Sequence, residues 1–343
     1  MKWQNHIGLD IGSSTIKLVQ LAPTSGERFK LVALGQIETP NFDDQIQWDQ
    51  SRSEIVKKLV SETRPNSNQV VISLPETQVY TRVIEMPQMA EPDLSSTIRF
   101  QAEQYIPVPI TDVVLKHQIM STPEQGVPGA KMSVLLVAAP NAILARYTLI
   151  LSKAGLSAIA VETEILSVGR AIIGAESVSP TSLLVHLGAE STTLAIFKNG
   201  LLVLVQSVSS GGAAIIRSVS SQLGLDFKQA EEYVKSYGLD ATKLEAKVAN
   251  GVKPVVELIL SEIRRVVAFY QTRDSGDPIK RMVLTGGMAL LPGLVEHFTQ
   301  SMDLEVQMGD PFGVVDLTAE QKKEIGENGA LFATAVGLAL KLV

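Results

Sequence analysis

The chain has 343 residues, 45% of them hydrophobic, and its 36 acidic and 30 basic side chains give a formal net charge of −6. Because single hydrophobic cores stop growing at about 250–300 residues, we expect more than one subdomain. The lack of cysteine excludes disulfides and thiolate metal sites, and the acidic balance without a basic patch gives no indication of nucleic-acid binding. With no signal peptide and no apolar run near the roughly 18 residues of a membrane span, a cytoplasmic protein is expected.

Residues 1–76 are expected to form a first core subdomain with the order strand–strand–strand–helix–strand. Alternation of apolar and polar residues supports the second strand, and an amphipathic pattern supports the helix. The expected segments are IGLDIG (7–12), TIKLVQL (15–21), FKLVALGQIE (29–38), the helix SRSEIVKKLVSE (51–62) and the buried strand QVVISLP (69–75).

A segment of different character follows at 77–160, and a connecting helix is expected within 161–180. The strands DVVLKHQIM and KMSVLLVAAP are expected to pair across the loop STPEQGVPGA, because Gly and Pro mark a turn there. The other expected elements are the strand VYTRVIEMP, a helix after Pro92 that Pro107 and Pro109 stop, a helix from Asn141 that ends at Gly155, the strand SAIAVE and the helix TEILSVGRAII.

The opening pattern returns near residue 181. SLLVHLGAESTTLAIFKNGLLVLVQSVS contains a strand, a turn of small residues, a strand, a turn at Asn199-Gly200 and a third strand. Two unrelated hairpins would explain this similarity, but the shared order of elements favours a duplicated architecture with two lobes. The second lobe is expected at 181–343, with helices at 213–223, 228–237 and 254–272 in a helical subdomain of about 213–275, the strand RMVLTGG, the helix LPGLVEHFTQSM and the closing helix GALFATAVGLALKL.

The tips of the two hairpins carry residues suited to phosphate binding. Small side chains at 12–15 let an anion approach backbone N–H groups, and Ser and Thr hydroxyls add donors. Asp10 cannot bind phosphate directly because like charges repel, but it can hold a divalent cation or its waters. Lys17 adds a positive charge. Two such hairpins, with the glycine turn of TGG beneath an adenine, would make one nucleotide site between two lobes.

In this order the segments resemble the actin-like ATPase superfamily and, within it, the PilM family of cytoplasmic type IV pilus assembly proteins, which is similar to the cell-division protein FtsA. The resemblance covers nearly the whole chain and implies an α/β fold of two lobes, with duplicated mixed-sheet RNase H-like cores and an inserted small α+β subdomain. The segments that carry it are GLDIGSSTIKLVQL, RVIEMPQMAEPDLSSTIRFQAEQYIPVPI with its EMP…AEQYIP spacing, AVETEILSVGRAI, HLGAESTTLAIFKNG, VLTGGMALLPGL and ATAVGLAL.

The resemblance implies a site for ATP and Mg²⁺. Asp10 would coordinate the cation through water, and Glu162 would approach it from the first connecting helix; a simple charge at the start of that helix is the alternative for Glu162. Glu232 and Lys235 resemble a Glu-x-x-Lys pair that holds ribose and adenine in heat-shock ATPases, or else they form a solvated surface ion pair. The implied nucleotide-binding residues are Gly12, Ser13, Ser14, Thr15, Lys17, Gly188, Ala189, Glu190, Ser191, Thr192, Gly286, Gly287 and Met288.

Two positions depart from the family pattern. His186 stands where the second phosphate motif normally has Asp, and Met288 stands where a third glycine is common. Histidine cannot replace a carboxylate that holds a metal and orients water. It could be a packed core imidazole, or it could contact phosphate if protonated. We therefore expect nucleotide binding with slow or absent hydrolysis, at most a weak ATPase.

Three functions compete: a nucleotide-binding assembly scaffold, an FtsA-like polymerising protein and a metabolic kinase of the same fold. A kinase needs a base near the γ-phosphate, and no carboxylate beyond Asp10 stands at such a position. FtsA-like proteins end in an amphipathic membrane helix, whereas this sequence ends at GLALKLV. Both observations favour the scaffold.

The resemblance also implies a partner, the short cytoplasmic tail of the inner-membrane protein PilN, bound in a groove between the first and the inserted subdomains. Other pilus platform proteins would join it, and the membrane would be reached only through partners. Phe100, Tyr105 and Ile106 of RFQAEQYIP are the expected apolar anchors. Alternatively these three residues pack the inserted subdomain.

Overall fold

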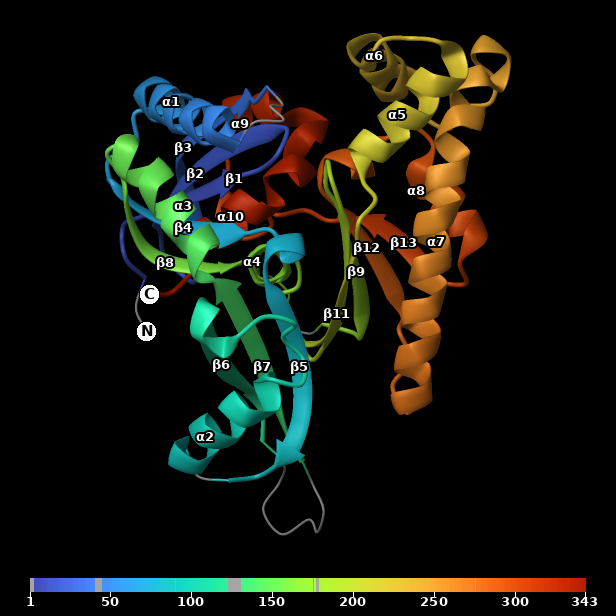
Figure 1. Ribbon diagram of the computed structural model, residues 1–343. Helices are drawn as coiled ribbons and strands as arrows, with labels where there is room; N and C mark the ends of the chain where they lie inside the picture. The colour runs from blue at the N-terminus through green and yellow to red at the C-terminus, as the bar shows by residue number, and fades with distance from the viewer. Residues whose placement is uncertain are drawn as a thin grey trace.

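Three sheets organise the protein, and helices cover them (Figure 1). Two of the sheets form the cores of two lobes, and the third projects from the first lobe. The computed structural model describes residues 3–40, 45–89, 91–122, 131–174, 176, 179–274 and 276–343.

The first sheet has the strand order β14-β3-β2-β1-β4-β8. β1 runs antiparallel to β2 and parallel to β4, and β8 continues the parallel half. β1 is buried on both faces: Ile7, Leu9 and Ile11 fill one face, and Gly8 on the other face lets the backbone of the last helix approach the strand. The strand bounds are β1 Ile7–Ile11, β2 Thr15–Pro23, β3 Phe29–Glu38, β4 Gln69–Leu74, β8 Ser157–Thr163 and β14 Val315–Asp316.

The second sheet repeats this layout with the order β11-β10-β9-β12-β13. β9 runs antiparallel to β10 and parallel to β12, as β1 does to β2 and β4. The expected duplication of the core is therefore confirmed. The strand bounds are β9 Ser182–Leu187, β10 Thr192–Lys198, β11 Leu201–Val208, β12 Arg281–Thr285 and β13 Glu305–Met308.

The inserted subdomain is a small antiparallel sheet of order β5-β7-β6 with helix α2 against it. β6 pairs with β7 as expected, although residues 123–130 of the connecting loop lie outside the described residues. The expected boundary at residue 160 is wrong, because β8 pairs with β4 and α3 packs on the first core. The bounds are β5 Tyr80–Pro87, α2 Glu91–Ala102, β6 Val113–Ser121, β7 Lys131–Pro140 and α3 Asn141–Lys153.

Two helices, α4 (Glu164–Ile172) and α10 (Ala333–Ala339), lie between the two large sheets and share one hydrophobic core with both. Their backbones touch, since a Cβ at Gly337 would lie 1.8 Å from the carbonyl oxygen of Ser167. α10 also packs on β1 and β14 pairs with β3, so the last part of the chain returns to the first lobe rather than staying in the second.

The remaining helices cover the outer faces of the two lobes (Figure 1). α7 begins seven residues before the expected start at 254 and includes Pro254. The tight turn η1 joins β4 to β5, η2 joins α2 to β6, η4 joins β12 to α8, and η5 joins α9 to α10. The bounds are α1 Gln45–Thr63, α5 Gly212–Leu223, α6 Phe227–Tyr237, α7 Lys247–Arg273, α8 Leu294–Ser301, α9 Ala319–Ile325, η1 Glu76–Gln78, η2 Ile110–Asp112, η3 Leu244–Ala246, η4 Gly287–Leu290 and η5 Gly326–Phe332.

Candidate functional site

Two turns of the same construction follow β1 and β9. The N–H of Gly12 donates to the carbonyl of Thr15 over 3.1 Å, and the N–H of Gly188 donates to the carbonyl of Ser191 over 2.9 Å. A Cβ at these glycines would lie 2.7 Å and 2.9 Å from the same carbonyls, so a larger residue would distort the turn. Within the described residues no hydrogen bond occupies the backbone amides of four turn residues, which are Ser13, Ser14, Ala189 and Glu190. Free amides at a turn tip are donors for an anion.

The second turn sits against the start of α5 and the adenosine motif. The N–H of Gly212 donates to the carbonyl of Gly188 over 3.0 Å. Met288 packs directly on this helix start, since a Cβ at Gly212 would lie 2.6 Å from its Sδ. Gly286 has a φ of +88°, and a Cβ there would lie 2.4 Å from the carbonyl oxygen of Leu187. The structure thus brings the expected second phosphate turn and adenosine motif together. Sequence reasoning missed Gly212, although the pair Gly-Gly before an apolar helix is visible in the sequence.

Charged side chains lie where the two lobes face each other. Lys17 Nζ lies 3.4 Å from Asp10 Oδ2 and donates to Thr15 Oγ1 over 2.7 Å. Glu164, the first residue of α4, faces them. Its burial and the charges of Asp10 and Glu76 raise the pKa of the Glu164 carboxyl to about 8. This carboxyl therefore carries a proton at neutral pH, and sequence reasoning did not identify it.

His186 lies at the end of β9, on the side of the second lobe that faces Asp10. Its Nδ1 is 2.8 Å from Thr285 Oγ1. Burial lowers the pKa of His186 to about 4, although the nearby Asp10 raises it. The imidazole is therefore neutral at pH 7, which agrees with a packed, hydrogen-bonded side chain rather than with a cationic phosphate ligand.

The expectation for Glu162 is wrong in position. Glu162 is the penultimate residue of β8 and not part of the connecting helix, which begins at Glu164. Its carboxylate is buried and paired with Arg170 at 2.7 Å and with Lys341 at 2.7 Å. The two cations keep the pKa of Glu162 below its usual value despite burial. With its oxygens already paired, Glu162 is not available to a metal, and Glu164 is the carboxylate beside Asp10.

The expected pair on α6 does not form. Lys235 pairs with Glu231 at 2.9 Å, one turn earlier on the same helix, and Glu232 is exposed. In the part of the chain that the structure describes, no hydrogen bond or ion pair joins these residues to either phosphate turn. The surface ion pair expected as the alternative is therefore made by Glu231 and not by Glu232, and the role of Glu232 and Lys235 toward ribose and adenine stays a prediction.

The expected partner anchors divide into exposed and buried residues. Phe100 is 67% exposed and Tyr105 is 39% exposed, with Arg82 stacked on the Tyr105 ring at 4.9 Å. Ile106 is only 8% exposed and packs with Val113 in the core of the inserted subdomain. Ile106 is therefore a core residue and not an anchor for a partner.

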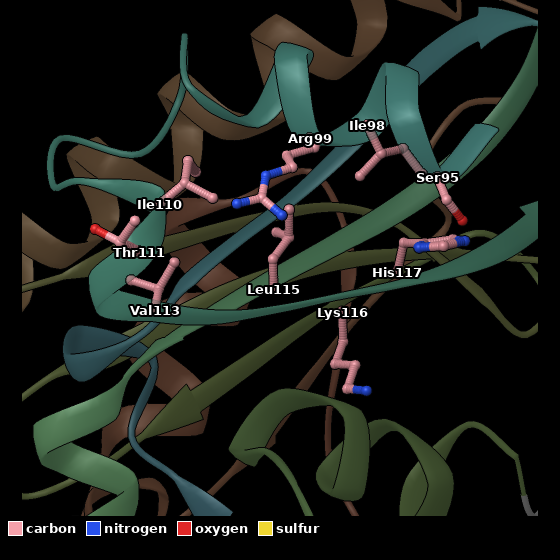
Figure 2. Close-up of a pocket in the computed structure, with 9 residues that line it drawn as sticks. All are labelled: Ser95, Ile98, Arg99, Ile110, Thr111, Val113, Leu115, Lys116 and His117. Atoms are coloured by element: carbon pink, nitrogen blue, oxygen red, sulfur yellow. The ribbon is translucent and has the colours of Figure 1, made fainter. Parts of the chain in front are cut away.

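A pocket of ≈ 630 Å³ lies between α2, η2 and the edge strand β6 (Figure 2). Ile98, Ile110 and Leu115 give it apolar walls, and the guanidinium of Arg99 projects between them. Lys116 points away from this space in the same view. Within the described residues no carboxylate pairs with Arg99. The pocket thus combines apolar walls with an unpaired positive charge.

No helix in the described part of the chain combines the length and the apolar character that crossing a membrane requires. Among the same residues, no three His, Asp or Glu side chains form a group that could hold a metal by themselves.

Comparison with known families and structures gives matches over nearly the whole chain. The family model for type IV pilus assembly protein PilM matches residues 8–343. The structure of a PilM–PilN type IV pilus biogenesis complex is similar with a TM-score of 0.84 and 27% identity, over 98% of each chain.

More distant similarities share the fold. EutJ from Carboxydothermus hydrogenoformans has a TM-score of 0.59 and 18% identity over 99% of this chain and 90% of its own. MreB5 of Spiroplasma citri has a TM-score of 0.52 and 13% identity over 97% of this chain and 94% of its own.

Among curated relatives, cell division protein FtsA of Rhizobium meliloti is 28% identical over 45% of this chain, and FtsA of Bacillus subtilis is 23% identical over 69%. The matches span only 38% and 58% of those two relatives. These similarities identify the fold as that of the actin-like ATPases.

Proposed function

The chain belongs to the PilM family of type IV pilus assembly proteins, and we propose that it is an ATP-binding scaffold of the pilus assembly platform that holds the cytoplasmic N-terminal tail of an inner-membrane PilN-like protein. The observation that carries the nucleotide part is the pair of matching glycine turns with free amides. The similar PilM structure was solved as a PilM–PilN complex, and MreB5, which shares the fold, was solved with AMPPNP bound. Through its partner the protein would act at the inner-membrane face, beside other platform proteins.

The donor set at the turns fits a triphosphate with Mg²⁺. Free amides at Ser13–Ser14 and Ala189–Glu190 would bind phosphate oxygens from two sides. Mg²⁺ usually keeps several waters and is held by one or two carboxylates together with substrate phosphates. Asp10 near the end of β1 and Glu164 at the start of α4 are two carboxylates beside the first turn. A bound cation would lower the raised pKa of Glu164 and ionise it. When bound, the cation would neutralise phosphate charge.

We expect hydrolysis to be slow. A carboxylate at the end of β9 would hold the metal and orient water, and this chain has a neutral His186 there, bonded to Thr285. Nucleotide would then act by fixing the angle between the lobes rather than by driving work. A ligand can shift that angle only by its differential affinity for the two arrangements.

For the partner we propose the pocket beside β6 rather than the residues Tyr105 and Ile106. β6 is an edge strand with a free row of backbone groups, and an extended peptide can add to such an edge while its side chains enter pockets. Arg99 would pair with an acidic or backbone oxygen of the peptide. The pocket adjoins the first lobe, since Asn141 at the start of α3 donates to the carbonyl of Thr111 over 3.1 Å.

Calorimetric titration with a synthetic peptide of the cytoplasmic PilN-like tail tests this proposal. Arg99→Glu should weaken binding by about tenfold or more, because it reverses the charge inside the pocket. Lys153→Glu makes the same charge reversal on the exposed last residue of α3, outside the pocket, and it should change binding by less than about twofold. Phe100→Ala tests the exposed neighbour on α2. If Arg99→Glu has no effect while Phe100→Ala does, the tail binds on the outer face of α2 instead.

A further inference from the structure

Arg52 of α1 is buried completely, with 0% of its surface exposed, and it contacts the first phosphate turn from behind. Its Nη2 donates to the carbonyl of Ser13 over 2.5 Å, and its Nη1 donates to the carbonyl of Pro40 over 3.1 Å. Thr39 Oγ1 donates to the same Ser13 carbonyl over 2.7 Å. Two side-chain donors from different elements therefore meet on one turn carbonyl.

This contact determines which way the turn amide points. A trans peptide is planar, so the carbonyl of Ser13 and the N–H of Ser14 point in opposite directions. Because Arg52 and Thr39 hold the carbonyl toward α1, the N–H of Ser14 points away from α1, and no hydrogen bond occupies it within the described residues. If the peptide turned over, a carbonyl oxygen would face the site and would repel a phosphate.

The guanidinium is itself held by its surroundings. It stacks on the ring of Trp48 at 4.5 Å. Arg146 of α3 lies over the same ring at 4.4 Å and pairs with Asp49 at 3.2 Å. Burial lowers the pKa of Arg52 to about 10, which leaves it charged at neutral pH. A charged group that is desolvated and rigid behind the turn adds positive potential where an anion would bind.

We propose that Arg52 is the positioning residue of the first phosphate turn: it fixes the Ser13–Ser14 peptide with its N–H toward the bound phosphate and places a buried positive charge behind it. This inference rests on the proposed nucleotide function. The second turn needs no such residue, because the first amides of α5 hold its carbonyls, as the 3.0 Å bond from Gly212 to Gly188 illustrates.

The test compares ligands with and without phosphate. In Arg52→Met, the dissociation constants of ATP and ADP should rise by about tenfold or more, while that of adenosine should change by less than about twofold. Thr39→Val removes the second donor and should raise the dissociation constant of ATP by about threefold. Lys57→Met is the matched control: it removes an exposed cation from the same helix, α1, and among the described residues it has no hydrogen bond or ion pair to the turn, so ATP affinity should stay within about twofold. Equal losses for adenosine and ATP in Arg52→Met, or no loss in Thr39→Val, would overturn the proposal.

Amide hydrogen exchange of the free protein separates this inference from the proposed function. The N–H of Gly12, bonded to Thr15 in the turn, should exchange faster in Thr39→Val and in Arg52→Met than in the wild type, and it should be unchanged in Lys57→Met. If the wild type binds no nucleotide but the turn amide responds in this way, the nucleotide function fails and the positioning role stands. If the amide is unchanged in both variants, the positioning role fails whatever the affinity for ATP. Should Arg52→Met not fold, Thr39→Val carries both readouts alone.

Discussion

The two phosphate turns have the same backbone bond and different surroundings. In the first, a side chain, Arg52, holds the turn from behind, and the ion pair of Asp10 and Lys17 lies beside it. In the second, backbone amides of α5 hold the turn, and a neutral His186 takes the place of the charge. Both turns therefore present free amides with the same geometry, whereas an acidic side chain at the end of the preceding strand stands only beside the first.

The largest effect is expected from closing either turn. Gly12→Val puts a Cβ 2.7 Å from the Thr15 carbonyl, and Gly188→Val puts one 2.9 Å from that of Ser191. Either change should weaken ATP binding by about a hundredfold or more, because the backbone amides of the two turns no longer point at the same phosphates. Gly313→Ala, whose Cβ meets nothing closer than 3.8 Å, serves as control. Calorimetry with unchanged affinity in one of the two variants would show that its turn is not part of the site.

The next effect separates the charged turn from the neutral one. In Asp10→Asn, the gain in ATP affinity that Mg²⁺ provides should fall by about tenfold to a hundredfold, since the cation loses a carboxylate. His186→Gln should leave that gain unchanged, because the imidazole carries no charge in the wild type. Titrations with Mg²⁺ and with EDTA measure both. A loss of the same size in both variants would mean that the two turns share the metal after all.

His186→Asp would make the second turn resemble the first. With a carboxylate on each side, the turnover of ATP should rise by about tenfold, and His186→Asn should not raise it. Phosphate release under single-turnover conditions measures the change. A wild-type rate of about 1 s⁻¹ or faster would already contradict the expectation that the histidine slows hydrolysis.

The smallest effect concerns pH. The folded protein keeps a proton on Glu164 up to about pH 8, whereas an ordinary glutamate has a pKa of 4.5. Stability contributed by this group is therefore complete below pH 4.5 and is lost as pH rises through 8. Glu164→Gln cannot titrate, so at pH 8.5 it should be more stable than the wild type by about 1 kcal/mol, allowing for partial exposure. Near pH 4.5 denaturant melts of the two proteins should coincide; a constant difference at all pH values would exclude titration as the cause.

Local patterns in the sequence predict much of the fold, and the predictions that the structure contradicts share one cause. The turns at Gly12 and Gly188 leave no room for a Cβ, and Gly286 has a positive φ, so each of these glycines is visible in the sequence as a requirement of its turn. Periodicity does not show which sheet a strand joins, so β8 was assigned to the inserted subdomain although it pairs with β4.

Sequence patterns are equally unable to show which distant residue a single side chain contacts. Glu162 and Glu164 stand two residues apart, and only the point at which β8 ends and α4 begins determines which one meets Asp10 and which one meets Arg170. Similarly, Tyr105 and Ile106 are neighbours with opposite environments, because the chain turns after α2. Such assignments depend on tertiary contacts between distant segments and are not encoded in spacing.

The crossing of α4 and α10 affects the rate at which the lobes can open rather than the affinity for a ligand. Because Gly337 meets Ser167 backbone to backbone, no side chain at this contact has to change rotamer when one lobe turns against the other. This point of the contact is free of interlocked side chains, whereas elsewhere the two helices are packed into the core that they share with both sheets. We expect the lobes to open on the microsecond-to-millisecond scale of hinge motions, much faster than a tightly held ligand leaves. The lifetime of the assembled platform would then be governed by ligand release, not by the mechanics of the hinge.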